Sequence, residues 1–369
     1  MNKSSTATVN VENTNVRKNK IVSFFEFWPL WVMYFPVAIQ WLLLSIRYRS
    51  LTLPLIANPS LTLSGMVGAT KSELMKMAGP QGKRSILNWS VHELNEISTE
   101  VQLGQWQQRF LDKGIQFPLV CKPDIGCRGS GVKKVENAQQ LLTIMRCYPK
   151  ETRLLVQKLA KNRPEVGIFF VKNPNTNDFS IVSLTFKESP TIVGDGQHTI
   201  SELILSDGRA SKLKSVYFQR HKKHLNRVLD QGELFPLVFS ASHCRGAIFK
   251  DARQHITQAL TDKIATIINE FPDLNYGRLD VKYEDLQSLK QGKNLEIIEI
   301  NGASAEMIHI WDKDSRFSDA LKTLLWQYRT LFKIGDMNRL KGHKTPGIKS
   351  VLKHWRLERS LAKYYPETD

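Results

Sequence analysis

Short apolar runs alternate with helix-like segments along most of the chain from residue 117 onwards. The apolar runs have the length and the β-branched and aromatic content of strands. The predicted strands are residues 119–122, 133–135, 154–157, 166–171, 179–185, 234–239, 278–283 and 295–300. The predicted helices between and after them are residues 138–146, 200–206, 213–229, 253–271 and 318–332. This alternation is typical of a mixed α/β (α+β) domain.

The stretch 24–46 is the most apolar part of the chain. From Phe27 to Ile46, 20 consecutive positions carry no charge, which is enough for a helix to cross a hydrocarbon core of roughly 30 Å. Pro29 and Pro36 interrupt the stretch, and basic residues flank both ends. Because positive flanks stay on the cytoplasmic side, a simple span fits poorly. We expect an interfacial or re-entrant membrane anchor, with a true span and a buried core helix as the alternatives.

The remaining pattern divides the chain into five parts. Residues 1–20 are polar and expected to be disordered, and 21–49 hold the apolar anchor. Residues 50–116 form a reduced N-terminal subdomain, with helices predicted at 71–78 and 91–113. Residues 117–333 form the main α/β domain. Residues 334–369 are a basic tail, whose predicted helix at 347–365 either lies on an anionic membrane or docks on the domain.

Charge narrows the choice of partners. The 52 basic and 35 acidic residues give a net charge of +17. Such a balance attracts nucleotides, acidic substrates, nucleic acid or an anionic membrane, although a solvated basic surface without a specific partner would look the same. The four cysteines show no CxxC or CxxH spacing. This argues against a disulfide framework or a zinc site and fits a reducing, cytosolic compartment.

A lysine at the end of a predicted strand is followed by a glycine-rich loop, in the run VCKPDIGCRGSGVKKV. Lys122 can reach nucleotide phosphates as a point charge. Glycines let backbone N–H groups turn inward around phosphate oxygens. The loop residues expected at the phosphates are Gly126, Arg128, Gly129, Ser130 and Gly131.

Acidic side chains stand on two later strands, in GRLDV and IIEIN. Glu299 and Asn301 are two positions apart, so their side chains share one strand face. With Asp280, they offer two carboxylates and an amide carbonyl, which are the hard oxygen ligands that Mg²⁺ prefers. The sequence therefore predicts a magnesium site.

Together these motifs resemble the ATP-grasp superfamily, over roughly residues 117–311. Its members include D-alanine–D-alanine ligase, glutathione synthetase, biotin carboxylase and the ligase domains of cyanophycin synthetase. The resemblance implies two mixed sheets gripping the nucleotide, with ATP and Mg²⁺ (or Mn²⁺) as cofactors. It implies that Lys122 contacts the phosphates and that Gln157, Lys158 and Leu159 lie at the adenine, where the family often has Glu in place of Gln157. It also implies a ribose contact for Glu165.

The resemblance gives Arg278 a catalytic role beside Lys122, as the arginine that holds the transferred phosphate and the developing oxyanion. Weaker candidates near the phosphates or the second substrate are His243, Arg245, Asp251 and His309. The segment 189–204 resembles the cyanophycin synthetase branch; we expect a tight turn at Gly194–Gly196, a helix start at Thr199 or Ser201, and a mainly structural role.

The N-terminal part departs from the family. Many of these ligases begin with a Rossmann-like substrate domain, and this chain shows no βαβ pattern before residue 117. The family's second phosphate-binding lysine is also hard to locate, with Lys83 and Lys113 as the candidates.

The resemblance implies an ATP- and Mg-dependent, ADP-forming carboxylate–amine ligase. A substrate carboxylate would attack the γ-phosphate, and an amine would displace phosphate from the acyl phosphate to leave an amide or peptide bond. We expect small-molecule or lipid-linked acids and amines as substrates, and contact with a membrane surface. The oligomeric state is not indicated.

Two other functions remain open. One is a membrane-associated, non-catalytic nucleotide-binding protein, a scaffold or sensor, against which the full set of Asp280, Glu299 and Asn301 argues. The other is a nucleic-acid binder, which rests on charge alone and lacks a recognisable motif, so we expect no nucleic-acid partner. The anchor predicts the cytoplasmic face of a membrane, with a soluble cytoplasmic protein as second choice.

Overall fold

One face of the central sheet is apolar, and the other carries both charged and apolar side chains. In this computed structural model, which describes residues 22–126, 130–162, 164–240 and 242–368, five strands lie in the order β11-β10-β5-β6-β9. They are β5 (Glu165–Lys172), β6 (Phe179–Glu188), β9 (Ile248–Asp251), β10 (Tyr276–Tyr283) and β11 (Leu295–Asn301). Val166, Ile168 and Phe170 alternate along β5 and pack in one core with Ile264 and Ile268 of helix α8 (Gln258–Asn269). On the opposite face, Phe169 and Tyr276 pack with Leu331 and Ile334 of helix α10 (Phe317–Leu340), and the charged side chains beyond them belong to the site.

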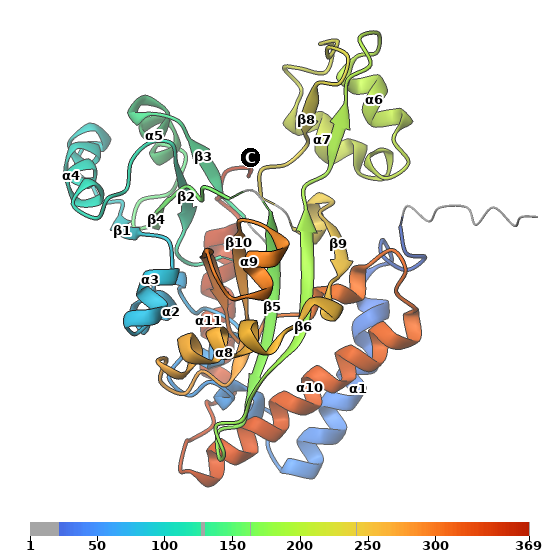
Figure 1. Ribbon diagram of the computed structural model, residues 1–369. Helices are drawn as coiled ribbons and strands as arrows, with labels where there is room; N and C mark the ends of the chain where they lie inside the picture. The colour runs from blue at the N-terminus through green and yellow to red at the C-terminus, as the bar shows by residue number, and fades with distance from the viewer. Residues whose placement is uncertain (1–21, 127–129, 163, 241, 369) are drawn as a thin grey trace, which may run out of the picture.

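A second sheet of four strands lies beside the central one, at the upper left of Figure 1, in the order β1-β4-β2-β3. Its strands are β1 (Trp89–Glu93), β2 (Leu119–Pro123), β3 (Lys133–Val135) and β4 (Arg153–Lys158). Helices α4 (Thr99–Leu111) and α5 (Ala138–Met145) cover it. Trp106 and Phe110 of α4 pack against Leu119 and Val156 of the sheet. Residues 50–116, expected to form a subdomain of their own, thus supply β1 and α4 to this sheet.

A smaller unit rises at the upper right of Figure 1. It holds the antiparallel pair of β7 (Thr191–Val193) and β8 (Leu234–Pro236), with helices α6 (Ile200–Ser206) and α7 (Lys214–Arg220) between them in the chain. Thr199 caps α6: its side chain accepts from the backbone N–H of Glu202, whose own side chain accepts from the N–H of Thr199. The predicted helix start is therefore confirmed, and Gly196, with φ of 73°, makes the turn before it.

The apolar N-terminal stretch forms helix α1 (Leu30–Tyr48), which begins after Pro29 and continues through Pro36. It lies along α10 (Phe317–Leu340), and the two helices run parallel at the lower right of Figure 1. The Trp41 ring packs edge-on against Phe332 at 5.2 Å. By length and composition α1 could cross a membrane, but two of its residues, Met33 and Val37, are buried in the fold.

The other elements are short, apart from the C-terminal helix. The remaining helices are α2 (Lys71–Lys76), α3 (Pro80–Ser85), α9 (Leu286–Lys290) and α11 (Ile348–Ala362). The 3₁₀ turns are η1 (Leu53–Ile56), η2 (Thr62–Gly65), η3 (Ala210–Leu213), η4 (His243–Arg245), η5 (Arg253–His255) and η6 (Ile308–Trp311).

Several expectations need correction. The two sheets were expected to be mixed, but the pairings between the named strands of the described residues are all antiparallel. The helix predicted at 91–113 starts only at Thr99, because residues 89–93 pair with β4 as an edge strand. The helix predicted at 213–229 ends at Arg220. Conversely, α10 runs eight residues beyond the predicted end at 332, to Leu340.

A buried asparagine ties the segment before α2 to the central sheet. The Asn58 side chain accepts from the backbone N–H groups of Asn275 (2.8 Å) and Tyr276 (3.0 Å). It donates to the carbonyls of Tyr276 (2.9 Å) and Ser64 (3.1 Å). The backbone N–H of Ala303, just after β11, donates to the same Ser64 carbonyl. Asn58 therefore helps to fix the end of β11, where the site lies.

Asn58→Ala should lower the free energy of unfolding by about 3 kcal/mol, because it leaves several buried backbone groups without partners. Urea denaturation would measure this. Ser60→Ala is the control, since Ser60 makes one exposed bond to Asp273 and its loss should cost less than about 0.5 kcal/mol. Equal stabilities of the two variants would contradict this role of Asn58.

Candidate functional site

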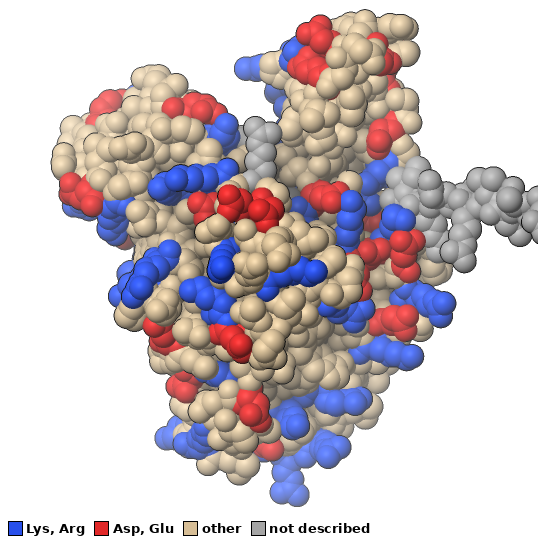
Figure 2. Space-filling model, viewed as in Figure 1, with Lys and Arg blue, Asp and Glu red and all other residues tan. Residues whose placement is uncertain are grey.

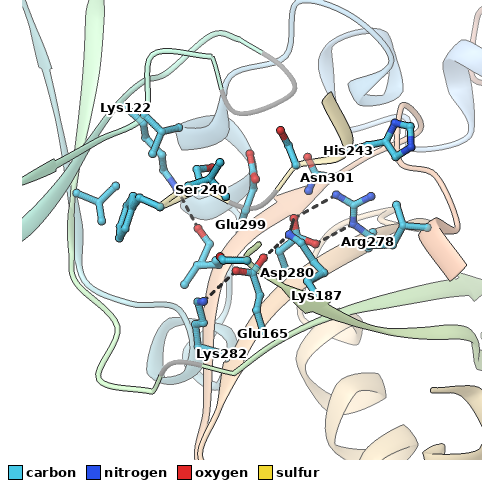
Figure 3. Close-up of a pocket in the computed structure, with 18 of the residues that line it drawn as sticks. Lys122, Glu165, Lys187, Ser240, His243, Arg278, Asp280, Lys282, Glu299 and Asn301 are labelled. Atoms are coloured by element: carbon cyan, nitrogen blue, oxygen red, sulfur yellow. Dashed lines mark hydrogen bonds and ion pairs between the residues drawn. The ribbon is translucent and has the colours of Figure 1, made fainter. Parts of the chain in front are cut away.

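A cavity of about 1890 Å³ lies between the two sheets and below the β7–β8 unit. Both sheets, that unit and the start of α1 contribute to its wall, so segments far apart in the sequence meet there. Figure 3 shows its charged centre.

Strand register brings four predicted site residues onto one face of the central sheet. Asp280 of β10 stands opposite Glu299 of β11, and Arg278 stands opposite Asn301. All four line the cavity. Gly167 of β5 is the neighbour of Asp280 on the other side. A Cβ at that glycine would lie 3.3 Å from the Arg278 side chain, so glycine leaves the guanidinium its space.

Asp280 is held by two cations. Arg278 donates to both of its carboxylate oxygens, at 2.8 and 3.1 Å, and Lys187 of β6 lies 3.4 Å away (Figure 3). Burial alone would raise the pKa of Asp280, but these two cations hold it down at about 2. Asp280 therefore stays ionised at neutral pH.

Glu165 is the second buried carboxylate of this face. It pairs with Lys187 and, at 3.0 Å, with Lys282. Burial opposes ionisation of Glu165, yet the two lysines lower its pKa. Lys187 thus bridges the predicted ribose contact and the predicted metal ligand, and nothing in the sequence pattern singled it out.

Lys122 reaches across from the four-stranded sheet. It is buried, and its ammonium donates to the Gln157 side chain at 2.9 Å and to the Ile298 carbonyl at 3.1 Å. The register between β10 and β11 shifts after Asp280, so Ile298 is an extra residue opposite no partner in β10. A bulge of this kind re-aims backbone groups. Burial lowers the pKa of Lys122 to about 8, although Glu299 opposes the shift.

A second lysine, Lys71, completes this side of the cavity. It is the first residue of α2, which Thr70 caps, and its ammonium donates to the Gly126 carbonyl at 2.7 Å. It also lies 3.9 Å from the Glu299 carboxylate. The candidates for the second lysine, Lys83 and Lys113, line a different cavity on the outer side of β1. The capping pattern could have located the start of α2, but not its position beside Lys122.

The glycine-rich loop begins and ends with left-handed backbone. Gly126 has φ of 153° and Gly131 has φ of 70°. A Cβ on Gly131 would lie 2.8 Å from the Tyr148 hydroxyl, so a larger residue would not fit. Gly126 and Ser130 line the cavity. Arg128 and Gly129 lie outside the described residues.

The C-terminal segment contacts both flanks of the same loop. The Tyr365 hydroxyl donates to the Ile125 carbonyl at 2.8 Å, and the Thr368 hydroxyl accepts from the backbone N–H of Val132 at 3.3 Å. Arg245 of η4 donates to the Thr368 hydroxyl at 2.9 Å. The segment ends between the two upper units in Figure 1. No pattern in the sequence indicates this contact.

The predicted adenine segment links the two sheets. Gln157, Lys158 and Leu159 end β4 and line the cavity. The Gln157 amide nitrogen is buried and has no hydrogen-bond partner among the described residues. Beyond it, the Glu296 carboxylate accepts from the backbone N–H groups of residues 161 and 162 at 3.1 and 3.2 Å, which fixes the linker to β11.

The donor set around Asp280 suits a hard cation in its chemistry. Asp280, Glu299 and Asn301 present oxygens from paired positions of two strands. The buried Asn301 amide nitrogen has no partner in the described part of the chain, so this amide can turn to a ligand. Within the same residues, no three His, Cys, Asp or Glu side chains cluster closely enough for a metal. A cation there would need the Asn301 amide, water or phosphate oxygens to complete its shell.

The weaker candidate residues do not lie together: one lines the cavity and two do not. His243 lines the cavity and packs on Trp311 at 4.3 Å. Asp251 forms a salt bridge with Arg253. His309 is buried, with its Nδ1 2.7 Å from the Ser183 hydroxyl, and burial lowers its pKa to about 4. Neither Asp251 nor His309 is among the described residues that line the cavity.

Comparison with known proteins finds likeness in three-dimensional structure only. No protein-family model and no curated protein matches the chain. The D-alanine–D-alanine ligase from Bacillus anthracis complexed with ATP overlaps with a TM-score of 0.42 at 12% identity, over 76% of this chain and 71% of that one. The VanG D-Ala:D-Ser ligase from Enterococcus faecalis overlaps with 0.39 at 14%, over 72% and 62%.

A bifunctional glutathione synthetase from Pasteurella multocida overlaps with a TM-score of 0.35 at 14% identity, over 70% of this chain and 36% of that one. The chain therefore spans about a third of that protein and less than two thirds of the VanG ligase. Because these TM-scores are below 0.5, the functional conclusion rests on the residues of this chain.

Asp280 should make the free energy of unfolding depend on pH in the acid range. Its folded pKa of about 2 lies below the ordinary value of 3.8, so its stabilising contribution is present above about pH 4 and is lost as the pH falls toward 2. A shift of this size is worth about 2 kcal/mol. The stability difference between wild type and Asp280→Asn should therefore shrink by about 2 kcal/mol between neutral pH and pH 2.

Urea unfolding at several pH values would measure this difference. Asp319→Asn removes an exposed carboxylate of α10 and serves as the control. A wild-type to Asp280→Asn difference that stays constant down to pH 2 would contradict the assignment.

Proposed function

We propose that this protein is an ATP-grasp-type, ADP-forming carboxylate–amine ligase that binds ATP between its two sheets. One observation carries the proposal. Buried Lys122 from the four-stranded sheet and the row of Arg278, Asp280, Glu299 and Asn301 from the central sheet face one cavity. Cations suited to phosphate thus lie next to oxygen ligands suited to Mg²⁺ in one cavity, and this is the combination that phosphoryl transfer needs.

The position of each residue in the cavity suggests which part of ATP or which ion it would bind. The backbone around Leu159 would receive the adenine, and Glu165 the ribose. Lys122 and Lys71 would bind phosphate oxygens, with the glycine-rich loop above them. Asp280, Glu299 and Asn301 would hold Mg²⁺, which when bound offsets phosphate charge as a Lewis acid.

The substrate carboxylate would attack the γ-phosphorus, and the bond to the bridging oxygen of ADP would break. An amine would then attack the acyl carbon and release phosphate. Arg278 would balance negative charge at both steps, because its guanidinium is fixed by Asp280 and by the Glu306 carbonyl, 3.2 Å away. We infer that these acids and amines are small or lipid-linked molecules bound at the end of the cavity near His243 and Trp311.

Lys122→Ala should weaken ATP binding by roughly tenfold to a hundredfold, because a buried charge-assisted contact with phosphate is lost. Calorimetric titration with ATP would measure it. Lys83→Ala is the matched control, because Lys83 is an exposed lysine outside this cavity. Equal affinities in the two variants would rule out Lys122 as a phosphate ligand.

ADP release in the presence of mixed acids and amines should be detectable for the parent protein and fall by at least about a hundredfold in Glu299→Gln, because the metal loses a carboxylate ligand. A coupled ADP assay would measure turnover, and product mass would identify the bond formed. Glu100→Gln, an exposed carboxylate of α4, should behave as the parent.

A non-catalytic nucleotide sensor is the second candidate. It is favoured by the pairing of both Asp280 oxygens with Arg278, which leaves fewer free positions for a metal. Such a sensor would bind ATP and show no ADP release with any acid and amine, whereas the ligase would turn over.

A further inference from the structure

One face of α1 is apolar and uncovered. Its side chains recur at helical spacing and are 39–75% exposed: Leu30, Trp31, Phe35, Ile39, Leu42, Leu43 and Ile46. The opposite face packs on α10, through Met33, Val37 and Trp41. Exposed apolar patches of this extent mark an interaction site in soluble proteins.

The packing of α1 decides how it could meet a bilayer. Its neighbour α10 has an outer row with Lys322, Arg329 and Lys333 exposed. A helix held along such a charged partner cannot cross a hydrocarbon core without burying those charges. It can lie in the interface, with only its uncovered face among the lipid chains.

The basic residues on and beside α1 indicate the lipid charge of the bilayer that it would contact. Helix α1 contains no acidic residue, and exposed Arg47 and Arg49 stand at its end. Figure 2 shows further Lys and Arg side chains along the lower right edge of the molecule, where α10 runs. On α10 the row of Lys322, Arg329 and Lys333 also includes Trp326, which is 40% exposed. Basic residues beside an apolar stripe, with tryptophans among them, suit an anionic lipid surface.

We propose that this face of α1, with the basic row of α10, docks flat on an anionic membrane. Leu30 and Tyr34 of α1 also line the cavity, beside Trp311 and the Glu306 side chain. Docking would therefore set the substrate end of the cavity close to the lipid headgroups. This inference goes beyond the proposed ligase activity and does not depend on it.

Co-sedimentation of the full-length protein with vesicles tests the proposal, without nucleotide. The protein should bind vesicles of phosphatidylcholine mixed with phosphatidylglycerol at least about tenfold more strongly than pure phosphatidylcholine vesicles. Phe35→Gln with Leu42→Gln should reduce binding to the mixed vesicles by at least about tenfold. The matched control is Val101→Gln with Leu111→Gln, two equally exposed apolar residues of α4.

Arg329→Glu with Lys333→Glu is a second variant that leaves the apolar face intact. It should weaken binding to the mixed vesicles by about tenfold and leave binding to pure phosphatidylcholine unchanged. The proposal is overturned if wild type does not bind the mixed vesicles, or if the α1 and α4 variants bind equally. It is also overturned if wild type is a dimer that ignores vesicles and becomes monomeric with the α1 substitutions. If the protein binds vesicles as described but releases no ADP, only the proposed ligase function is contradicted.

Discussion

The contact between Arg278 and Asp280 is the constraint on which the site is built. Asp280 is buried and Arg278 is partly buried, and a charge shielded from water without a partner is costly. Each therefore needs the other, and Asp280 needs Lys187 as well. The neighbouring strands accommodate this pair. Gly167 leaves space beside the Arg278 side chain, and the register places Glu299 opposite Asp280. Well-packed apolar side chains in place of such buried charges often stabilise a fold equally well, so this charged cluster fits the proposed role in ligand binding.

The two sheets meet at this charged face rather than through a shared apolar core alone. Lys122 crosses from β2 to the carbonyl at Ile298, a group exposed by the bulge in β11. Its cation is buried and has a lowered pKa, so an incoming anion would improve its surroundings. The Glu296 carboxylate also ties the linker after β4 to β11. A ligand bound at Lys122 would therefore contact a point where the two sheets meet.

Much of this arrangement could be predicted from sequence, because the strands that carry it are long and strongly patterned. The strands holding Lys122, Asp280 and Glu299 appear where their apolar runs indicate, and the spacing of Glu299 and Asn301 gives the shared face. The edge strand β1 could not be predicted in this way. Its five residues, WSVHE, read equally well as the start of the helix that follows, and only pairing with β4 decides between the two. Lys71 lies in a capping pattern that indicates only the start of a helix, and no motif surrounds Lys187, so only tertiary packing brings these two lysines to the cavity.

The position of the apolar N-terminal helix also could not be predicted from its sequence pattern alone. Length and hydropathy cannot separate a span, a surface anchor and a core helix, since all three require a long apolar segment. The distinction lies in what each face of the helix contacts. Met33 and Val37 are buried against the fold, while Phe35 and Leu42 are more than half exposed. A core helix would have the second face covered, and a spanning helix would have no charged neighbour along its length. Helix α1 has one exposed face and a charged neighbour, which fits the proposed interfacial position, and Leu30 and Tyr34 at its start line the cavity.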